Sequence, residues 1–357
     1  MMEEKYPYYT EEPPKNSPYH KAYLDGIDAY LKAAREPANE RRRAFITPQS
    51  YQKDPEGYRQ KLCEMLGYPL TQPKTEPKLI EKRFVVRDAN VNIYRIQLLF
   101  WDTVPLYGLY FEQTEDAKNR PLVIGVHGGG GTPELCAGFY WKSANYHQLV
   151  RRMTNRGVNV FAPQLLLWKH EEYGTEFERL HYDGKLRQLG GSITALELYL
   201  VRGCIDYFIR TGEVCAEKIG TAGLSYGGKF ALHLAAIDPR IKACYSCSWV
   251  SDEYCYSGAD WSYYNAQSLF GTVETAAMIA PRALTVAMGD HDKLFLADLT
   301  RKACDGIAEY YRVFDREDRF LPVIFEGDHE LDQGESELDF LINALNESIN
   351  SERNERK

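Results

Sequence analysis

The chain has 357 residues, of which 44% are hydrophobic and 26% are charged, and its formal net charge is −8 at pH 7. This length allows one large domain or two ordinary ones, and the hydrophobic content is sufficient for a sizeable core. The negative charge argues against a nucleic-acid partner or an anionic membrane surface, because both attract basic proteins. No apolar stretch of the sequence approaches the length of a membrane span.

The N-terminus and the cysteines bear on the location of the protein. Residues 1–20 are acidic and proline-rich and have neither the basic region nor the apolar core of a secretory signal. The eight cysteines are scattered through apolar segments, which is typical of reduced, buried thiols. These features favour a cytoplasmic location. Cys244 and Cys247 have the spacing of a metal or redox pair, but no second pair of ligands accompanies them, so we interpret them as part of a core strand.

The first third of the chain predicts helices followed by an antiparallel meander. After a loose arm at residues 1–17, apolar residues recur at helical spacing in residues 19–45 and 54–69. Three β-rich runs then follow, separated by Asp and Asn, at residues 78–88, 91–100 and 106–115.

From Pro121 onward, short apolar runs alternate with helical patterns. Runs that are apolar throughout must be covered on both faces, as in the interior of a parallel sheet. They lie at residues 121–129, 158–164, 218–225, 241–250, 281–290 and 321–330, with helical patterns at 146–157, 192–212, 227–239, 298–314 and 339–357. The alternation predicts an α/β protein with a doubly wound, mostly parallel sheet that binds its ligand at the carboxyl ends of the strands.

Ser225 is the candidate nucleophile. It lies between glycines in the stretch GLSYGG, directly after an apolar run and directly before a helical pattern. Such a stretch predicts a sharp strand-to-helix turn that presents the serine. A serine hydroxyl needs a base, and His329 follows the last apolar run at the carboxyl edge of the predicted sheet. His127 and His233 are interpreted instead as a loop-shaping residue and a core residue.

An acid and an oxyanion site complete the pattern. The run AMGDHDKLF offers Asp290 and Asp292 after the preceding strand, with Asp252 and Glu253 as further candidates. Four consecutive glycines, residues 128–131, follow another strand, and together with the amide of Tyr226 they could hold an oxyanion. The run lacks the Lys-Ser/Thr of a phosphate-binding loop. The order Ser, Asp, His therefore predicts a serine hydrolase.

These motifs resemble the α/β-hydrolase superfamily, and within it the acetyl-xylan-esterase-like and dienelactone-hydrolase-like proteins. The resemblance covers about residues 58–345 and rests above all on KIGTAGLSYGGKFALHLAAIDPRIKACYSCSW, IAPRALTVAMGDHDKLF and FEGDHE. It implies an α/β-hydrolase domain at residues 79–350, preceded by an N-terminal arm and helical extension at residues 1–78.

The resemblance also implies roles for individual residues. It implies Ser225 as nucleophile, His329 as base and Asp292, rather than Asp290, as acid. The oxyanion donors would be the amides of Tyr226 and Gly129, with Gly130 as the alternative to Gly129. Dienelactone hydrolases carry a cysteine where this chain has a serine, so their activity is not expected here. The relatives that degrade polymeric xylan are secreted and carry a signal peptide. Because residues 1–20 do not resemble such a signal, polymeric xylan is not expected as the substrate.

We therefore expect a serine esterase that works through an acyl-enzyme, without a metal or organic cofactor. Acetyl esters of carbohydrates and small aryl or alkyl esters are the expected small-molecule substrates. Aromatic residues crowd the segments after two strand ends and could stack on such a substrate; they are Trp168, Trp249, Tyr254, Tyr256, Trp261, Tyr263 and Tyr264. Lys169, Arg179 and Arg187 could pair with an acidic substrate. Core packing and surface solvation are the alternatives. A prolyl-oligopeptidase-like peptidase or amidase, and a non-catalytic binding protein on a hydrolase fold, remain alternative functions.

The connection at residues 165–191, which follows the strand ending near Gln164, is longer than most strand–helix loops. At the carboxyl edge of a sheet such an insert is usually a lid or a substrate-binding element, and surface decoration is the alternative. The sequence does not predict an oligomeric state.

Overall fold

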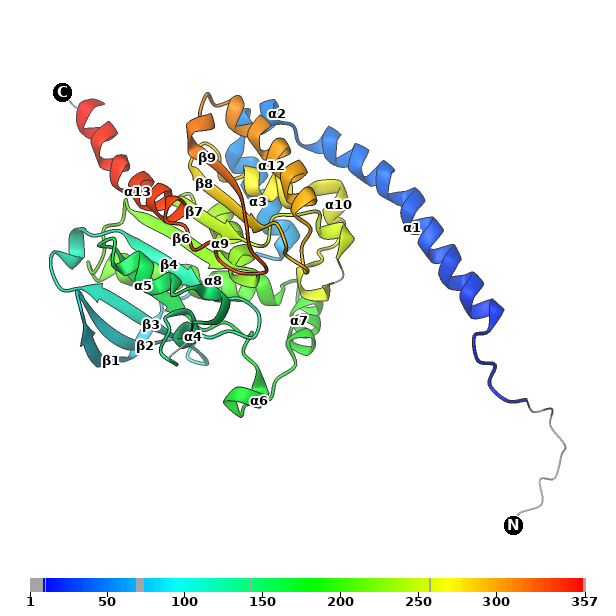
Figure 1. Ribbon diagram of the computed structural model, residues 1–357, viewed down its shortest axis with the longest axis horizontal. Helices are drawn as coiled ribbons and strands as arrows, with labels where there is room; N and C mark the ends of the chain where they lie inside the picture. Colours follow the sequence, from blue (N-terminus) through cyan, green and yellow to red (C-terminus); the bar gives the residue numbers. More distant parts are fainter. Residues whose placement is uncertain (1–8, 10, 69–73, 141–142, 257, 356–357) are drawn as a thin grey trace, which may run out of the picture.

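A nine-stranded sheet forms the centre of the molecule (Figure 1). The computed structural model describes residues 9, 11–68, 74–140, 143–256 and 258–355. The strand order is β1-β2-β3-β5-β4-β6-β7-β8-β9. The strands are Lys78–Asp88 (β1), Val91–Phe100 (β2), Val104–Gln113 (β3), Leu122–Val126 (β4), Asn159–Pro163 (β5), Ile219–Leu224 (β6), Ile241–Cys247 (β7), Ala283–Gly289 (β8) and Phe320–Phe325 (β9).

The sheet has an antiparallel part and a parallel part. The pairs β1–β2, β2–β3 and β3–β5 are antiparallel, whereas β5, β4, β6, β7, β8 and β9 run parallel to one another. Every residue of β4, β5, β6 and β8 is buried, because helices cover both faces there. Both the predicted meander and the predicted doubly wound α/β class are confirmed.

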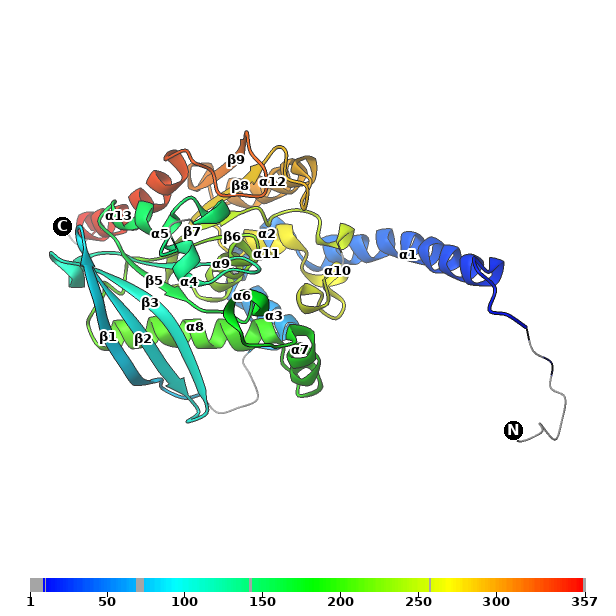
Figure 2. The ribbon, with the colours of Figure 1, turned by 60° about the horizontal axis from the view of Figure 1, so that its bottom comes forward.

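Helices cover the two faces of the sheet in two groups (Figure 2). Residues of α3, α8, α9, α11 and α12 join one hydrophobic cluster, and residues of α4, α5 and α13 join the other. The helices are Pro18–Phe45 (α1), Pro48–Lys53 (α2), Pro55–Leu66 (α3), Pro133–Cys136 (α4), Leu149–Thr154 (α5), His170–Tyr173 (α6), Arg179–Gln188 (α7), Ile193–Arg210 (α8), Tyr226–Ile237 (α9), Ala266–Leu269 (α10), Thr272–Ala277 (α11), Ala297–Arg312 (α12) and Ser336–Glu355 (α13). None of the described helices combines the length and the apolarity that crossing a bilayer requires.

Two segments extend the sheet-and-helix core. The long insert after β5 forms the two helices α6 and α7. The N-terminal extension contributes α2, which the sequence did not predict, and α3; they contact α12 and α9 respectively. In Figures 1 and 2 the N-terminal half of α1 projects away from the rest of the molecule. Most of the predicted loose arm, residues 1–8 and 10, lies outside the described residues.

Candidate active site

The turn between β6 and α9 carries Ser225 in an unusual backbone conformation. Its φ is 59° and its ψ is −123°, a region that non-glycine residues rarely occupy. The flanking glycines permit this turn, since a Cβ at Gly223 would lie 2.3 Å from the Gly227 carbonyl oxygen. A Cβ at Gly227 would lie 2.1 Å from the carbonyl oxygen of Val126 in β4. The GLSYGG stretch therefore forms the sharp strand-to-helix turn that the sequence predicted.

His329 and Asp292 meet at the carboxyl edge of the sheet. Nδ1 of His329, which follows β9, lies 2.8 Å from Oδ2 of Asp292, which follows β8. Oδ1 of Asp292 accepts hydrogen bonds from the amides of Leu294 and Phe295, at 2.8 and 3.0 Å. Burial alone would raise the pKa of Asp292, but the hydrogen bonds from His329 and these amides hold the pKa below its usual value. A charged carboxylate thus orients the imidazole.

Two of the three other candidate acids, Asp290 and Asp252, are engaged elsewhere. Oδ1 of Asp290 accepts a hydrogen bond from the amide of Gly327 at 3.1 Å, and it helps to join the two loops at the ends of β8 and β9. Asp252 forms an ion pair with Arg35 of α1. Of the two aspartates in the AMGDHDKLF run, Asp292 is therefore the one that contacts His329.

A loop that the sequence did not single out supports the His329 loop. Nδ2 of Asn145 donates a hydrogen bond to the carbonyl oxygen of His329 at 2.8 Å. The amide of Leu331 donates to the carbonyl oxygen of Asn145 at 2.9 Å. Nε2 of His147 lies 2.5 Å from Oε2 of Glu330. No sequence motif pointed to Asn145 or His147, because their pairing with the His329 loop exists only in the folded chain.

His127 and His233 are both buried and structural. Nδ1 of His127 contacts the carbonyl oxygen of Gly128 at 2.9 Å, and its Nε2 accepts a hydrogen bond from the amide of Leu165 at 3.0 Å. Burial lowers the pKa of His127 to about 4. Burial likewise lowers the pKa of His233 to about 3, and its Nδ1 contacts the carbonyl oxygen of Lys229 at 2.8 Å. These contacts fit the loop-shaping and core positions predicted for the two residues.

The glycine run leaves one amide without an acceptor among the described residues. The Gly130 amide donates to the carbonyl oxygen of Leu167 at 2.6 Å, and the amides of the first and last glycines of the run also have acceptors within the protein. The amide of Gly129 has none in the described part of the chain. Tyr226 is the first residue of α9, where an amide has no acceptor within its own helix. Gly130, the alternative oxyanion donor, is therefore engaged, and the Gly129 and Tyr226 amides are available.

Ser225 and His329 line the same cavity, which has a volume of about 560 Å³. Within the described part of the chain the Ser225 hydroxyl makes no hydrogen bond, and in many hydrolases this bond forms only when substrate is bound. Among the described residues that line it, the wall is mainly aromatic and aliphatic and contains no Asp, Glu, Lys or Arg. Its other residues are Gly128, Gly129, Asn145, Tyr146, Leu224, Tyr226, Cys255, Tyr256, Trp261, Leu294 and Phe295.

Of the residues expected to bind substrate, Tyr256 and Trp261 line this wall, whereas Trp168, Lys169, Arg179, Arg187 and Trp249 are not among its lining residues. Nε1 of Trp168 donates to the carbonyl oxygen of Thr175 at 3.2 Å, within the insert. Trp249 is only 2% exposed and packs behind Trp261 in the core. Arg187 pairs with Asp183 one helical turn away in α7, at 2.6 Å. These contacts correct the predicted set: Trp168, Trp249 and Arg187 are occupied in packing and pairing outside the cavity.

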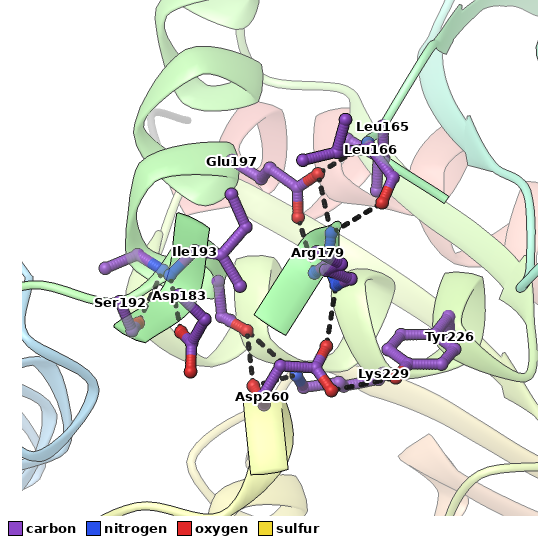
Figure 3. Close-up of polar contacts among 12 residues, drawn as sticks. Leu165, Leu166, Arg179, Asp183, Ser192, Ile193, Glu197, Tyr226, Lys229 and Asp260 are labelled. Atoms are coloured by element: carbon purple, nitrogen blue, oxygen red, sulfur yellow. Dashed lines mark hydrogen bonds and ion pairs between the residues drawn. The ribbon is translucent and has the colours of Figure 1, made fainter. Parts of the chain in front are cut away.

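A buried polar network joins the insert to the turn at Ser225 (Figure 3). Arg179 of α7 forms ion pairs with Glu197 of α8 and with Asp260, at 2.8 and 2.6 Å. Oδ1 of Asp260 in turn accepts a hydrogen bond from the Tyr226 hydroxyl at 3.0 Å. Burial would lower the pKa of Arg179, but the two carboxylates raise it above its usual value. Arg179, expected as a possible partner of an acidic substrate, is therefore committed inside the protein.

Lys229 adds a second buried cation to this network (Figure 3). Its Nζ donates to Oγ1 of Thr194 at 2.8 Å and to the carbonyl oxygen of Asp260 at 3.4 Å. Burial lowers the pKa of Lys229 to about 8. Nothing in the sequence pattern indicated this role, since a lysine in a helix usually extends into solvent.

The cysteine pair in β7 has no metal-binding arrangement around it. Cys244 and Cys247 are both buried within the strand, as the core-strand interpretation predicted. Among the described residues no group of three or more His, Cys, Asp and Glu side chains is arranged to hold a metal ion.

The strand order, the strained serine after β6 and the Asp–His pair after β8 and β9 define the α/β-hydrolase fold, and the chain has this fold. It is 28% identical over 280 residues to YtaP of Bacillus subtilis (strain 168), a protein named as a hydrolase; the match covers 71% of this chain and 90% of YtaP. No family model matches the chain.

Two solved structures illustrate the shared fold. One is a Bacteroides fragilis NCTC 9343 protein described as an acetyl xylan esterase, with 16% identity, a TM-score of 0.61 and coverage of 79% of this chain and 76% of that chain. The other is a glucuronoyl esterase from Solibacter usitatus, with 14% identity, a TM-score of 0.63 and coverage of 84% of this chain and 94% of that chain. At these identities the likeness establishes the fold.

Proposed function

We propose that the protein is a serine hydrolase that cleaves carboxylic esters. The observation that carries this proposal is the shared cavity: the strained Ser225, the Asp292-oriented His329 and the free amides of Gly129 and Tyr226 all border it. The names of similar proteins support the class, since YtaP is named as a hydrolase and both solved structures are described as esterases.

The geometry supports a two-step reaction. His329 accepts the proton of the Ser225 hydroxyl, whose oxygen attacks the ester carbonyl carbon. The amides of Gly129 and Tyr226 donate hydrogen bonds to the resulting oxyanion. His329 then gives its proton to the leaving alcohol, and water cleaves the acyl-enzyme by the same route. Asp292 stays charged throughout and stabilises the imidazolium.

The cavity supports a substrate that is uncharged around the ester. Among the residues of its wall that the structure describes, none is acidic or basic other than His329, and burying an unpaired substrate charge there would be unfavourable. Tyr256, Trp261 and Phe295 offer ring faces to an aryl group or to the apolar face of a sugar. Acetyl esters of carbohydrates and small aryl or alkyl esters both fit these requirements.

The cysteines support a reducing compartment such as the cytoplasm as the place of action. All eight are free thiols, and five of them are buried. Disulfides are common in oxidising compartments and rare in reducing ones.

Labelling with a fluorophosphonate probe tests the proposal. The folded protein should react with the probe and hydrolyse p-nitrophenyl esters, and Ser225→Ala should abolish both. A folded wild-type protein that resists the probe and all esters would favour a non-catalytic binding role. Faster turnover of aminoacyl anilides than of matched esters would favour a peptidase or amidase.

A further inference from the structure

Among the described residues, the contacts of α1 with the body of the molecule are concentrated in its C-terminal half. The C-terminal half is anchored: Arg35 pairs with Asp252, Arg41 donates to Ser268, and Ala38 is buried. Residues 18–33 are all exposed, and Figures 1 and 2 show this half projecting from the body of the molecule. A helical segment of this length without tertiary packing is only marginally stable in water. We therefore expect the projecting half of α1 to pack against a partner.

A continuous apolar stripe runs along α1 from its anchored half to its projecting half. Leu24, Ile27, Leu31, Ala34 and Ala38 alternate at spacings of three and four residues, the repeat of helices that pair side by side. Ala38 is buried against the body, whereas Leu24, Ile27 and Leu31 are 61%, 39% and 45% exposed. The apolar stripe of α1 thus packs against the body in the C-terminal half and is exposed in the projecting half.

We propose that the projecting half of α1 pairs antiparallel with the same helix of a second copy of this chain. In the register that the stripe defines, Leu24 packs against the partner's Ile27, and two-fold symmetry repeats each contact. Lys21 then faces the partner's Asp28 along one flank. Tyr23 faces the partner's Tyr30 along the other.

Charge and size both support a second copy as the occupant. In the symmetric pair, Lys21 of each copy faces Asp28 of the other, which gives two contacts between opposite charges. No like charges face each other at these positions. Two tyrosine rings at about 150 to 250 Å² each, with three aliphatic side chains, give a buried area on the order of the about 800 Å² per partner typical of specific dimers. An anionic membrane suits the helix poorly, since its polar face carries acids as well as bases and the chain's net charge is −8.

A groove at the root of the projecting half continues this surface. It has a volume of about 710 Å³ and is lined by Leu31 and Arg35 of α1 together with aromatic residues of the segment after β7. In the antiparallel register the first turn of the partner's helix lies over this groove. Tyr256 and Trp261 line both the groove and the active-site cavity, so the second copy would sit beside the cavity.

A charge-reversal series on the full-length chain tests the pairing. Light scattering during gel filtration should give twice the monomer mass of 41.0 kDa for the wild type. Lys21→Glu or Asp28→Lys places like charges opposite each other twice and should weaken the dimer about tenfold or more. The double variant restores the opposite pairs and should restore the dimer. Glu36→Lys is the matched control for Asp28→Lys: it makes the same charge change on the same helix, outside both the stripe and the groove, and should leave the mass unchanged.

Three results would overturn the pairing. They are a monomeric wild type throughout the micromolar range, a double variant that stays as weak as the single variants, and a Leu24→Glu variant that remains fully dimeric. Binding of monomeric wild type to vesicles of anionic lipid would assign the stripe to a membrane instead. Far-ultraviolet circular dichroism of each variant checks that the fold is intact, and all these readouts are independent of esterase activity.

Discussion

The Tyr226 hydroxyl donates a hydrogen bond to the Asp260 carboxylate at 3.0 Å, and Asp260 pairs with Arg179 of the insert. The residue whose amide is a proposed oxyanion donor is thus fixed through its side chain by two segments distant from it in the sequence. Because Arg179 and Asp260 are buried, this connection has little competition from water. Through Arg179 and Asp260, the insert therefore helps to hold Tyr226 in place beside the active-site cavity.

We expect Tyr226→Phe to lower the free energy of unfolding by about 1 kcal/mol, because Asp260 keeps its ion pair with Arg179. Asp260→Asn should cost more, about 3 kcal/mol, because Arg179 loses one of its two buried carboxylates. Tyr264→Phe is the matched control, since Tyr264 is 92% exposed. Urea unfolding measures all three changes. Equal effects of Tyr226→Phe and Tyr264→Phe would show that the Tyr226 hydrogen bond contributes nothing.

The two aspartates after β8 should differ sharply in their effect on turnover. Asp292→Asn should lower kcat by about 10⁴-fold with little change in KM, because the amide no longer stabilises the imidazolium of His329. Asp290→Asn should lower kcat by less than about tenfold, because Asp290 accepts from the Gly327 amide and does not contact His329. Steady-state kinetics with p-nitrophenyl acetate separates the two. A larger loss in Asp290→Asn would contradict the assignment of Asp292.

Stability should fall as the pH is lowered from about 6.5 towards 4. The folded-state pKa values of His127 and His233 are depressed by burial to about 4 and about 3, so the unfolded chain binds these protons first. Each histidine then contributes up to about 1.4 kcal/mol per pH unit within this window. Urea unfolding at several pH values measures the slope.

His233→Leu should remove one of the protons that the chain takes up on unfolding, and so should make the dependence of the free energy of unfolding on pH less steep. This change is expected whatever the effect of the substitution on stability at neutral pH. Leu234→Ala is the control: Leu234 is buried in the same helix but binds no proton, so its loss should lower stability and leave the slope unchanged. An unchanged slope in His233→Leu would mean that His233 is protonated in the folded state.

Charge at the cavity wall should decide between neutral and anionic esters. Wild-type kcat/KM for p-nitrophenyl acetate should exceed that for p-nitrophenyl hydrogen succinate by about tenfold or more, because no Lys or Arg lines the cavity in the described part of the chain. Leu294→Arg should narrow this ratio, since Leu294 lines the cavity and is 60% exposed. Leu296→Arg is the control, because Leu296 is 58% exposed and is not among the lining residues. If both variants narrow the ratio of the two kcat/KM values, the effect comes from a positive charge acting at a distance and not from the cavity wall.

The sequence by itself determined the strands, most of the helices and the turn at Ser225. These follow mainly from local rules: apolar periodicity selects helix or strand, and Gly223 is required by a backbone contact with Gly227 in the same turn, whereas Gly227 is required by the carbonyl oxygen of Val126 in β4. Six of the described helices, namely α2, α4, α6, α7, α10 and α11, were not predicted. Five of them have four to six residues, which is too short for an apolar period to show, and α7 is a largely polar helix of ten residues within the insert.

Only the tertiary structure decided which side chains meet. Asp290 and Asp292 lie two residues apart, and only the folded loops bring Asp292, and not Asp290, against His329. The Gly130 amide is engaged because Leu167 of the insert lies against it. Arg179 pairs inside the protein, although its sequence neighbourhood is that of a surface helix. Each of these contacts joins segments far apart along the chain, and such contacts depend on the packing of the whole molecule, which local periodicity does not encode.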